Sequence, residues 1–493
     1  MRLGIAAVFF VATIVPAFGA EGEFDTAPWL DDLRQIRAGM LDKYANFEWA
    51  VFEREVNLAA LFGETESRLR DAGSDAEAQA IIDRAVRSIS DGHLRVKWPN
   101  AAAKAGAAAT DVCGAPDYDA RIRGQPLGPY LPGYHALSDE VAPEFPAGWI
   151  DSGGQKIGVI RIGLFAVQGY PELCGTVRAR LGLADHSPCH EKCADGLESA
   201  QYAALSRDLA LRVRSVERLG ATVLLVDITG NGGGSEWAEA AARVVSPIKL
   251  RSERRAGVRG EHWDKHWGSL AKELRQAAAR SASPADSAQL EDWARQADQA
   301  EANALTPCSA LPFWSGQRPE CEWLAPAFYA TGLLADADAT LLHQKPWGPL
   351  VFSPAQYDFE ESVWRGPLLV LVDGGTGSAA EEFSAVLQDN RVAVVMGAPT
   401  AGAGCGHTDG GTPVTLTHSH GILELPDCAR IRRDGSNEAR GIDPDVLIGF
   451  RGTDGMHRKG LRAGAALGRG VAAAAMLCQR ERCHHQASVH RSR

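Results

Sequence analysis

The chain has 493 residues, a formal net charge of −11 and a sequence pI near 5.7. Sequence-independent binding of nucleic acid needs clustered cations facing phosphates, so this acidic balance excludes nucleic acid as a partner. Hydrophobic residues make up 45% of the chain and charged residues 23%, which excludes wholesale disorder. At about 150 residues per unit, the length suits two to four structural units.

The first 20 residues have the pattern of a secretory signal peptide. One arginine precedes an apolar run from Leu3 to Val15, and small residues around Gly19 offer a cleavage site. An uncleaved anchor is the alternative interpretation. Because no later segment is an uninterrupted run of about 18 apolar residues, we expect no stable membrane insertion after signal removal. The expected location is the periplasm or the extracellular space.

Ten cysteines in an oxidising compartment are expected to form disulfides. The predicted local pairs are Cys308 with Cys321, Cys405 with Cys428, and Cys174 with either Cys189 or Cys193. A zinc site is the alternative for the cluster of His186, Cys189, His190 and Cys193, but ligands spaced so closely meet a metal at cramped angles. We favour a disulfide there and at Cys478 with Cys483, and we predict neither a metal nor another cofactor.

Helical and strand-like segments follow one another in a regular order along the chain. Apolar residues at a helical period predict three helices within residues 26–92, and an irregular connector follows them. Apolar runs predict buried strands at 157–162, 222–226, 368–372 and 392–396. Helices predicted at 199–219, 236–245 and 379–388 lie between or beside them, which is typical of a mostly parallel sheet with crossover helices.

A charged segment, residues 250–305, interrupts this core and is interpreted as a surface insertion of two amphipathic helices. Its arginine cluster, which includes Arg255, is interpreted as a solvated face rather than a binding patch. The predicted domains are the signal (1–20), an N-terminal helical domain (21–97), the connector (98–150), a core in two parts (151–249 and 306–452) around the insertion (250–305), and a C-terminal tail (453–493).

Two predicted strands end in glycine-rich turns, at residues 226–234 and 372–382. Ligand and catalytic groups gather at the carboxyl ends of parallel strands, and glycines let backbone N–H groups point into a cleft there. A phosphate site fits poorly, because no G-x-x-x-x-G-K-[ST] motif occurs. Acyl transfer needs an exposed serine at the start of a helix, and Ser378 has that position. A helix cap is the alternative role for this serine.

Five motifs in order resemble those of a serine peptidase family that includes the tail-specific, or C-terminal processing, proteases and the tricorn core. They are Asp91-Gly92-His93, the strand end from Asp227 to Gly234, the turn from Gly377 to Phe383, the loop from Gly397 to Gly402, and Glu438 with Gly441 to Asp445. The resemblance covers most of residues 26–450. It implies an α/β, crotonase/ClpP-like core of stacked ββα units with an N-terminal helical bundle and a helical insertion.

The resemblance also implies peptide hydrolysis with Ser378 as the nucleophile. Tail-specific members have a catalytic Lys within G-x-x-T-x-G-K-G, and this chain has Ala403 at that place. The tricorn-like branch instead uses a His before the core and a Glu after it, which His93 and Glu438 match. The implied relay is coherent, because a neutral imidazole can take the serine proton and a carboxylate can fix its tautomer. His407, beside the loop where the Lys would be, is the alternative base.

The expected oxyanion hole consists of the N–H of Ala379 with that of Gly233 or its neighbour Gly232. Thr229 replaces an Arg that is common at this strand end, so another group must do what that Arg does. Ala379 also stands where tricorn-like members have an acidic residue, so a preference for basic side chains does not carry over. The chain has no convincing peptide-capture module in the connector.

The expected function is that of an exported serine endopeptidase, which cleaves peptides or unfolded protein segments through an acyl-enzyme. The alternative is a non-catalytic protein that binds a ligand or peptide on the same scaffold. A third hypothesis is an enzyme that depends on Cys405. The natural substrate and the oligomeric state stay open.

Overall fold

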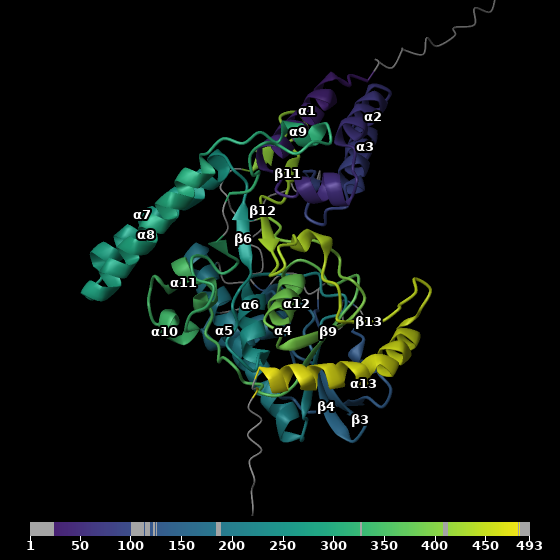
Figure 1. Cartoon of the computed structure of the whole chain (residues 1–493), viewed down its shortest axis with the longest axis vertical. Helices are drawn as coiled ribbons and strands as arrows, with labels where there is room; N and C mark the ends of the chain where they lie inside the picture. Colours follow the sequence, from purple (N-terminus) through teal and green to yellow (C-terminus); the bar gives the residue numbers. More distant parts are fainter. Residues whose placement is uncertain are drawn as a thin grey trace, which may run out of the picture.

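The computed structural model describes residues 24–99, 113, 119–121, 124, 126–183, 189–325, 328–407, 413–481 and 483. The predicted signal peptide and much of the predicted connector lie outside the described residues. A mixed α/β body carries a projecting pair of helices on one side and a helical bundle near the N-terminus (Figure 1).

Seven strands form the central sheet, in the order β13-β9-β8-β5-β4-β3-β2. The parallel strands are β4 (Gln155–Arg161), β5 (Val223–Asp227), β8 (Leu368–Val372), β9 (Ala393–Gly397) and β13 (Val446–Leu447). An antiparallel edge follows with β3 (Ala147–Ser152) and β2 (His135–Ala136). The predicted mostly parallel sheet is thus confirmed. Its inner strands are buried from end to end, as expected where helices cover both faces.

Alternate residues of these strands point into two separate cores. On one face, Leu224 and Val370 pack under α5 (Glu191–Arg218), α6 (Trp237–Val245) and α12 (Ala379–Asp389). On the other face, Leu225 and Leu369 pack against α13 (Met456–Arg480), the yellow helix that crosses the body in Figure 1. In the described part of the chain, α13 is long and apolar enough to cross a membrane, yet it packs against the sheet as a core helix does.

The three predicted N-terminal helices are α1 (Ala27–Lys43), α2 (Leu58–Arg70) and α3 (Asp75–Ser88), with a π-helical turn η1 (Trp49–Glu53) between the first two. Side-chain caps begin two of them, because Asn57 and Ser74 each accept a backbone N–H of the first turn. Strand β1 (Arg95–Lys97) then pairs with β11 (Ile422–Glu424), which pairs with β10 (Val414–Thr415). This small sheet holds the turn after α3 beside the loops that follow β9.

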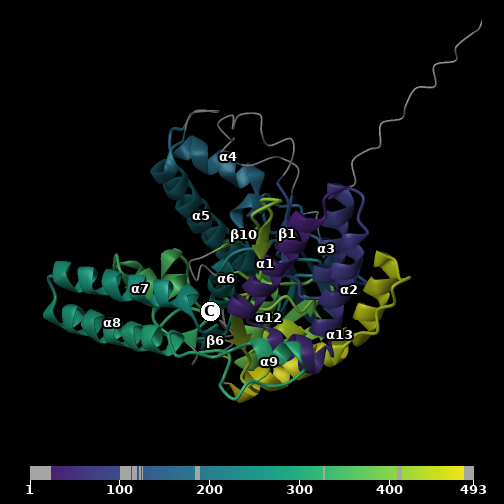
Figure 2. The same cartoon turned by 90° about the horizontal axis from the view of Figure 1, so that it is seen from above.

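The segment predicted as an insertion contains α7 (Glu261–Arg280) and α8 (Pro284–Ala304). The two helices lie side by side and project from the body (Figures 1 and 2). Just before them, β6 (Arg254–Gly257) pairs with β12 (Cys428–Ile431) and with β7 (Phe328–Tyr329). The remaining helices are α4 (Pro171–Arg180), α9 (Leu311–Trp314), α10 (Ala339–His343) and α11 (Gly348–Val351). Short 3-10 turns complete the described structure, at Gly128–Tyr130, Val167–Gly169, Ser353–Gln356 and Glu438–Arg440.

Four disulfides join eight of the ten cysteines. The predicted pairs Cys308–Cys321 and Cys405–Cys428 are present. The predicted bond from Cys174 to Cys189 or Cys193 is wrong, since the bonds are Cys113–Cys174 and Cys189–Cys193. The physical reason is position: Cys189 and Cys193 are four residues apart at the start of α5, whereas Cys174 is buried on α4. Cys478 and Cys483 are free thiols, contrary to the prediction.

Candidate active site

The turn between β8 and α12 forces Ser378 into an unusual backbone conformation. Its φ is +55° and its ψ is −124°, a region that side chains other than glycine rarely adopt. Ser378 directly precedes the first residue of α12, and buried Thr376 fixes the preceding turn by donating from Oγ1 to the Ile228 carbonyl at 3.1 Å. In α/β-hydrolases, a strained turn between a strand and a helix exposes the nucleophilic serine, and Ser378 also lies in a strained turn between a strand and a helix.

His93 reaches this serine from the turn after α3. Its Nε2 lies 3.1 Å from Ser378 Oγ, and its Nδ1 lies 2.7 Å from the carbonyl oxygen of Ala403. A carbonyl can only accept, so Nδ1 carries the hydrogen and Nε2 is left as the acceptor for the serine hydroxyl. The Asp91 carboxylate holds the turn by accepting the His93 backbone N–H at 3.0 Å. The imidazole is therefore in the tautomer that a general base needs.

The pKa of His93 is lowered from its usual value of 6.5, mainly because burial disfavours the imidazolium. The hydrogen bond to Ala403 and the charge of Asp91 raise this pKa, while the neighbouring charges of His407 and Arg430 lower it further. A general base must be neutral to accept a proton. Because its pKa is lowered, the His93 imidazole is neutral at neutral pH and becomes protonated only as the pH falls below 6.5.

Glu381 ties the serine turn to the loop that holds the histidine. Its buried carboxylate accepts four hydrogen bonds: from Ser378 N–H at 2.8 Å, Thr400 Oγ1 at 2.5 Å, Gly402 N–H at 2.6 Å and Ala403 N–H at 2.8 Å. Burial raises its pKa, and these donors oppose that shift. Three of these partners are backbone N–H groups, which can only donate, so both carboxylate oxygens are held as acceptors.

Glu438 does not occupy the place that the predicted relay gave it. The Ala403 carbonyl takes Nδ1 of His93, and the Glu438 carboxylate instead accepts from Arg430, at 2.8 Å from Nε and 3.0 Å from Nη2. The physical reason is the burial of both groups, since a guanidinium away from water needs a carboxylate partner. The structure therefore places Ser378 and His93 in contact, whereas Glu438 contacts Arg430 instead of His93.

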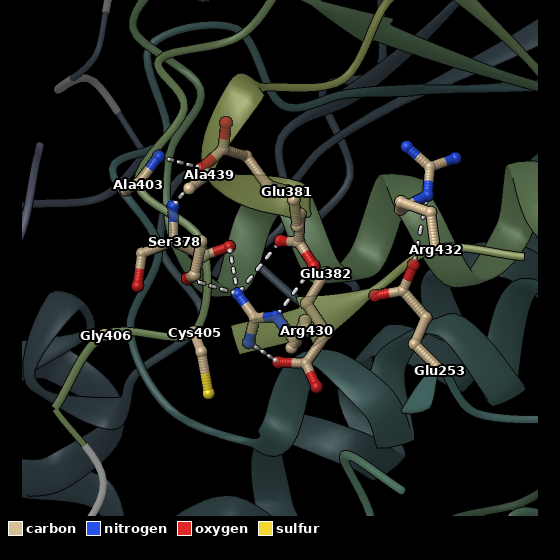
Figure 3. A network of polar contacts seen from close by, with 12 residues as sticks. Glu253, Ser378, Glu381, Glu382, Ala403, Cys405, Gly406, Arg430, Arg432 and Ala439 are labelled. Atoms are coloured by element: carbon tan, nitrogen blue, oxygen red, sulfur yellow. Dashed lines mark hydrogen bonds and ion pairs between the residues drawn. The ribbon is translucent and has the colours of Figure 1, made fainter. Parts of the chain in front are cut away.

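Arg430 links Glu438 to the nucleophile. Its Nη2 also donates to the carbonyls of Ser378 at 3.2 Å and Gly404 at 2.7 Å, and its Nη1 donates to Glu382 at 2.8 Å (Figure 3). Burial raises the pKa of Glu382 to about 8, although Arg430 lowers it. Burial also raises the pKa of Glu253, which lies in ion-pair contact with Arg432.

The N–H groups predicted for the oxyanion hole differ in whether they already have an acceptor. Ala379 is the first residue of α12, so its N–H has no acceptor within the helix. Gly233 lies against the nucleophile, because a Cβ added there would be 2.7 Å from Ser378 Cβ. The Gly233 N–H, however, already donates to Asn231 Oδ1 at 2.9 Å. Among the described residues, the N–H groups of the other two predicted donors, Ala379 and Gly232, have no side-chain acceptor.

Arg161 on β4 contacts the glycine-rich turn that contains Thr229. Its Nη1 donates to the Thr229 carbonyl at 2.7 Å, and the ion pair with Asp227 spans 3.5 Å. Asp227 in turn accepts from Thr229 N–H at 3.0 Å and from Gly128 N–H at 2.7 Å. A guanidinium from the neighbouring strand thus stabilises the glycine turn.

The alternative base and the alternative nucleophile are both placed elsewhere. His407 Nε2 lies 2.7 Å from the carbonyl oxygen of His93, so this ring supports the turn rather than facing Ser378. Cys405 is bonded to Cys428 and has no free thiol, which excludes a Cys405-dependent enzyme. Within the described residues, no group of three or more His, Cys, Asp or Glu side chains is arranged to hold a metal.

Ser378 and His93 open into a cavity of about 390 Å³, named here the nucleophile cavity. Its other lining residues include Glu236, Arg255 and Tyr357. A strained serine, a base within hydrogen-bond reach and an adjoining cavity are the parts of a serine hydrolase.

Comparison with known proteins identifies the family to which this serine hydrolase site belongs. A model of peptidase family S41 matches residues 197–448, and the chain belongs to that family. The family makes it a serine peptidase of the tail-specific protease type, as the motif order predicted. No curated protein sequence matches the chain significantly.

Solved structures share the fold at low sequence identity. Mature CPAF in complex with lactacystin superposes with a TM-score of 0.56 at 14% identity, over 92% of this chain and 98% of that one. Mature CPAF alone gives a TM-score of 0.55 at 14% identity, over 92% and 97% of the two chains. The photosystem II D1 C-terminal processing protease gives 0.34 at 14% identity, over 90% and 99%. At this identity the likeness to CPAF shows the fold.

Sequence reasoning missed three groups that build the site: Glu381, Arg430 and the carbonyl of Ala403. One of them had a local signal, because Ser378-x-x-Glu381 has the spacing of a capping box, in which the Glu accepts the backbone N–H of the first residue. Arg430 is one of three arginines within four residues at the end of a short strand, and a carbonyl has no side-chain signature. Neither could be found from spacing alone.

Proposed function

We propose that the protein is a serine endopeptidase that cleaves peptides or unfolded protein segments, with Ser378 as nucleophile and His93 as general base. The observation that carries the proposal is the 3.1 Å contact between His93 Nε2 and Ser378 Oγ, with Nδ1 held by Ala403. We also propose export, in keeping with the four disulfides, and retain the predicted domain boundaries and the crotonase-like arrangement of the core.

In the first step, Ser378 Oγ attacks the carbonyl carbon of the scissile bond as its proton passes to His93 Nε2. The negative charge that develops on the carbonyl oxygen is stabilised by the N–H of Ala379 and of Gly232, where one donor is worth about 3 kcal/mol. The imidazolium then gives its proton to the leaving amine, and an acyl-enzyme remains. Water, deprotonated by the same imidazole, hydrolyses the ester and restores the serine.

Glu438 keeps a place in this proposal as a positioning residue. Its carboxylate neutralises Arg430, which holds the carbonyl of Ser378 and the carbonyl of Gly404, next to Ala403. The relay of Ser378, His93 and Glu438 thus becomes a Ser/His pair whose backbone is fixed by a buried ion pair. The substrate class follows from the peptidase family and from the open cavity beside the serine.

The test is Ser378→Ala, with Ser384→Ala on the same helix as the matched control. Ser378→Ala should abolish cleavage of an unfolded protein and labelling by a fluorophosphonate, while Ser384→Ala should retain both. Unfolding curves should show that both variants fold. Cleavage that persists in Ser378→Ala would refute the nucleophile assignment, and a wild-type protein that binds peptides without labelling at any pH would favour the non-catalytic binding protein.

A further inference from the structure

The nucleophile cavity does not end at the catalytic pair. A second cavity of about 520 Å³, named here the hairpin groove, shares the lining residues Glu236, Arg255 and Ala330 with it. One wall of the groove is α7 of the helical pair, and the other is the segment from Gly332 to Ser353 around α11. Figure 2 shows α7 and α8 extending together from the body. The insertion therefore adjoins the active site.

Helix α7 contributes residues both to the hydrophobic core and to the wall of the groove. Leu274, Ala277 and Ala278 are buried in the core of the molecule. His266, Leu270 and Glu273, spaced by four and three residues, line the groove from one side of the helix, and Ala277 continues that side into the core. Leu270 is half-buried: it packs against the core and also lines the groove.

The groove has an apolar strip of Trp267, Leu270, Pro349 and Leu350 among polar lining residues such as Lys265, Ser269 and Glu273, and it is polar where it meets the nucleophile cavity. Trp267 packs on Phe328 with ring centroids 4.2 Å apart, so the wall there is fixed. Leu270 and Leu350 are half-buried and Pro349 is exposed, which leaves apolar surface uncovered. At the junction, Arg255 Nη1 lies 4.0 Å from Glu236 Oε1, and its guanidinium lies 5.9 Å from the Trp263 ring.

We propose that the hairpin groove binds an apolar side chain of the polypeptide substrate, several residues away from the scissile bond. This inference rests on the proposed function, because the continuity of the two cavities is what places a substrate chain in the groove. An extended chain advances about 3.3 Å per residue and turns successive side chains to opposite sides. A chain that leaves Ser378 and crosses the polar junction can therefore insert one leucine or aromatic residue between α7 and α11.

The experiment measures binding in the Ser378→Ala background, where no bond is cut. Polar peptides of about twelve residues, which span roughly 40 Å when extended, carry a single Leu that is moved along the sequence. Fluorescence anisotropy should find one Leu position that lowers the Kd about tenfold relative to Asp at the same position, as expected for one apolar subsite. Leu270→Asp should abolish that preference, and Leu350→Asp on the opposite wall should do the same.

The control is Gln276→Asp, which adds the same charge at an exposed position of α7 outside the groove and should keep the preference. Equal Kd values for all peptides would overturn the inference, as would a preference that survives both leucine variants. If Leu270→Asp instead dissociates a dimer in light scattering, the groove is an interface between copies and the inference fails. Cleavage of the same peptides by the wild-type protein is measured separately. Peptides that bind without being cleaved would show that the proposed function fails even though the inference about the groove holds.

Discussion

Glu381→Gln tests whether the catalytic geometry depends on one buried carboxylate. The substitution keeps the shape of the side chain but replaces one acceptor oxygen by an amide that can only donate. If the remaining oxygen stays with Thr400 and Gly402, the new amide faces the N–H groups of Ser378 and Ala403, which were accepted at 2.8 Å each. Two buried donors then lose their partner.

The magnitude follows from these two lost hydrogen bonds. A buried donor left without an acceptor costs about 1–3 kcal/mol, so the turn and loop together lose roughly 2–6 kcal/mol unless they move apart. Movement carries the Ala403 carbonyl away from His93 Nδ1. Because a misplacement of about 1 Å can reduce the rate about 100-fold, we expect a loss of that order in kcat/KM.

A pH profile separates this positioning role from a general loss of stability. The Ala403 carbonyl raises the pKa of His93, so losing it should lower that pKa further and move the acid limb of kcat/KM to lower pH. Glu382→Gln is the comparison variant, since Glu382 contacts Arg430 rather than the backbone N–H groups of Ser378 and Ala403. Peptide hydrolysis between pH 4 and 8 measures both variants. An acid limb in Glu381→Gln that coincides with the wild type, together with full activity, would refute the reasoning.

Three further predictions concern the same site. Glu438→Gln should lower the free energy of unfolding and the activity but leave the acid limb of kcat/KM close to its wild-type position, because the carboxylate contacts a guanidinium rather than His93. An acid limb lowered by about one pH unit or more would instead support a direct relay from Glu438 to His93. His407→Gln should move the acid limb to higher pH, since the charge of His407 lowers the pKa of His93, and an unmoved limb would contradict this. Gly233→Ala should reduce kcat on the order of 100-fold while the circular dichroism spectrum is retained. The reason is that φ at Gly233 is +111° and that the new Cβ would lie 2.7 Å from Ser378 Cβ. A wild-type kcat in this variant would show that the turn can adjust.

The fold was predictable where a pattern repeats over many residues. The buried strands β5, β8 and β9 are continuous apolar runs, and their helices have clear periods, so the sheet followed from sequence. Strand β6 was missed, because four residues beginning with two arginines give no such pattern and become a strand only by pairing with β12. Within the site, motif order predicted Ser378 and His93, which the structure places in contact.

The partner of His93 Nδ1 was not predictable, because it is a backbone oxygen selected by tertiary packing. A carboxylate was expected there, and the sequence does contain one at Glu438. Whether that carboxylate faces the imidazole depends on what else is buried nearby, and Arg430 is the stronger competitor because its charge cannot be removed at ordinary pH. Spacing along a chain does not reveal such competition between buried charges.

Ala403, at the place where tail-specific proteases have a lysine, affects how the site is built. Ala403 is 6% exposed, and a Cβ added at Gly92 would lie 3.0 Å from its Cβ, so the histidine turn and this loop meet at their closest approach. A larger side chain at either position would push the Ala403 carbonyl away from His93 Nδ1. Two small residues therefore let a backbone oxygen orient the imidazole, and Glu381 holds that oxygen in place through the Ala403 N–H. In the proposed mechanism, the loop that carries the lysine in tail-specific proteases instead orients a histidine, through the Ala403 carbonyl on Nδ1 and without a carboxylate on the imidazole.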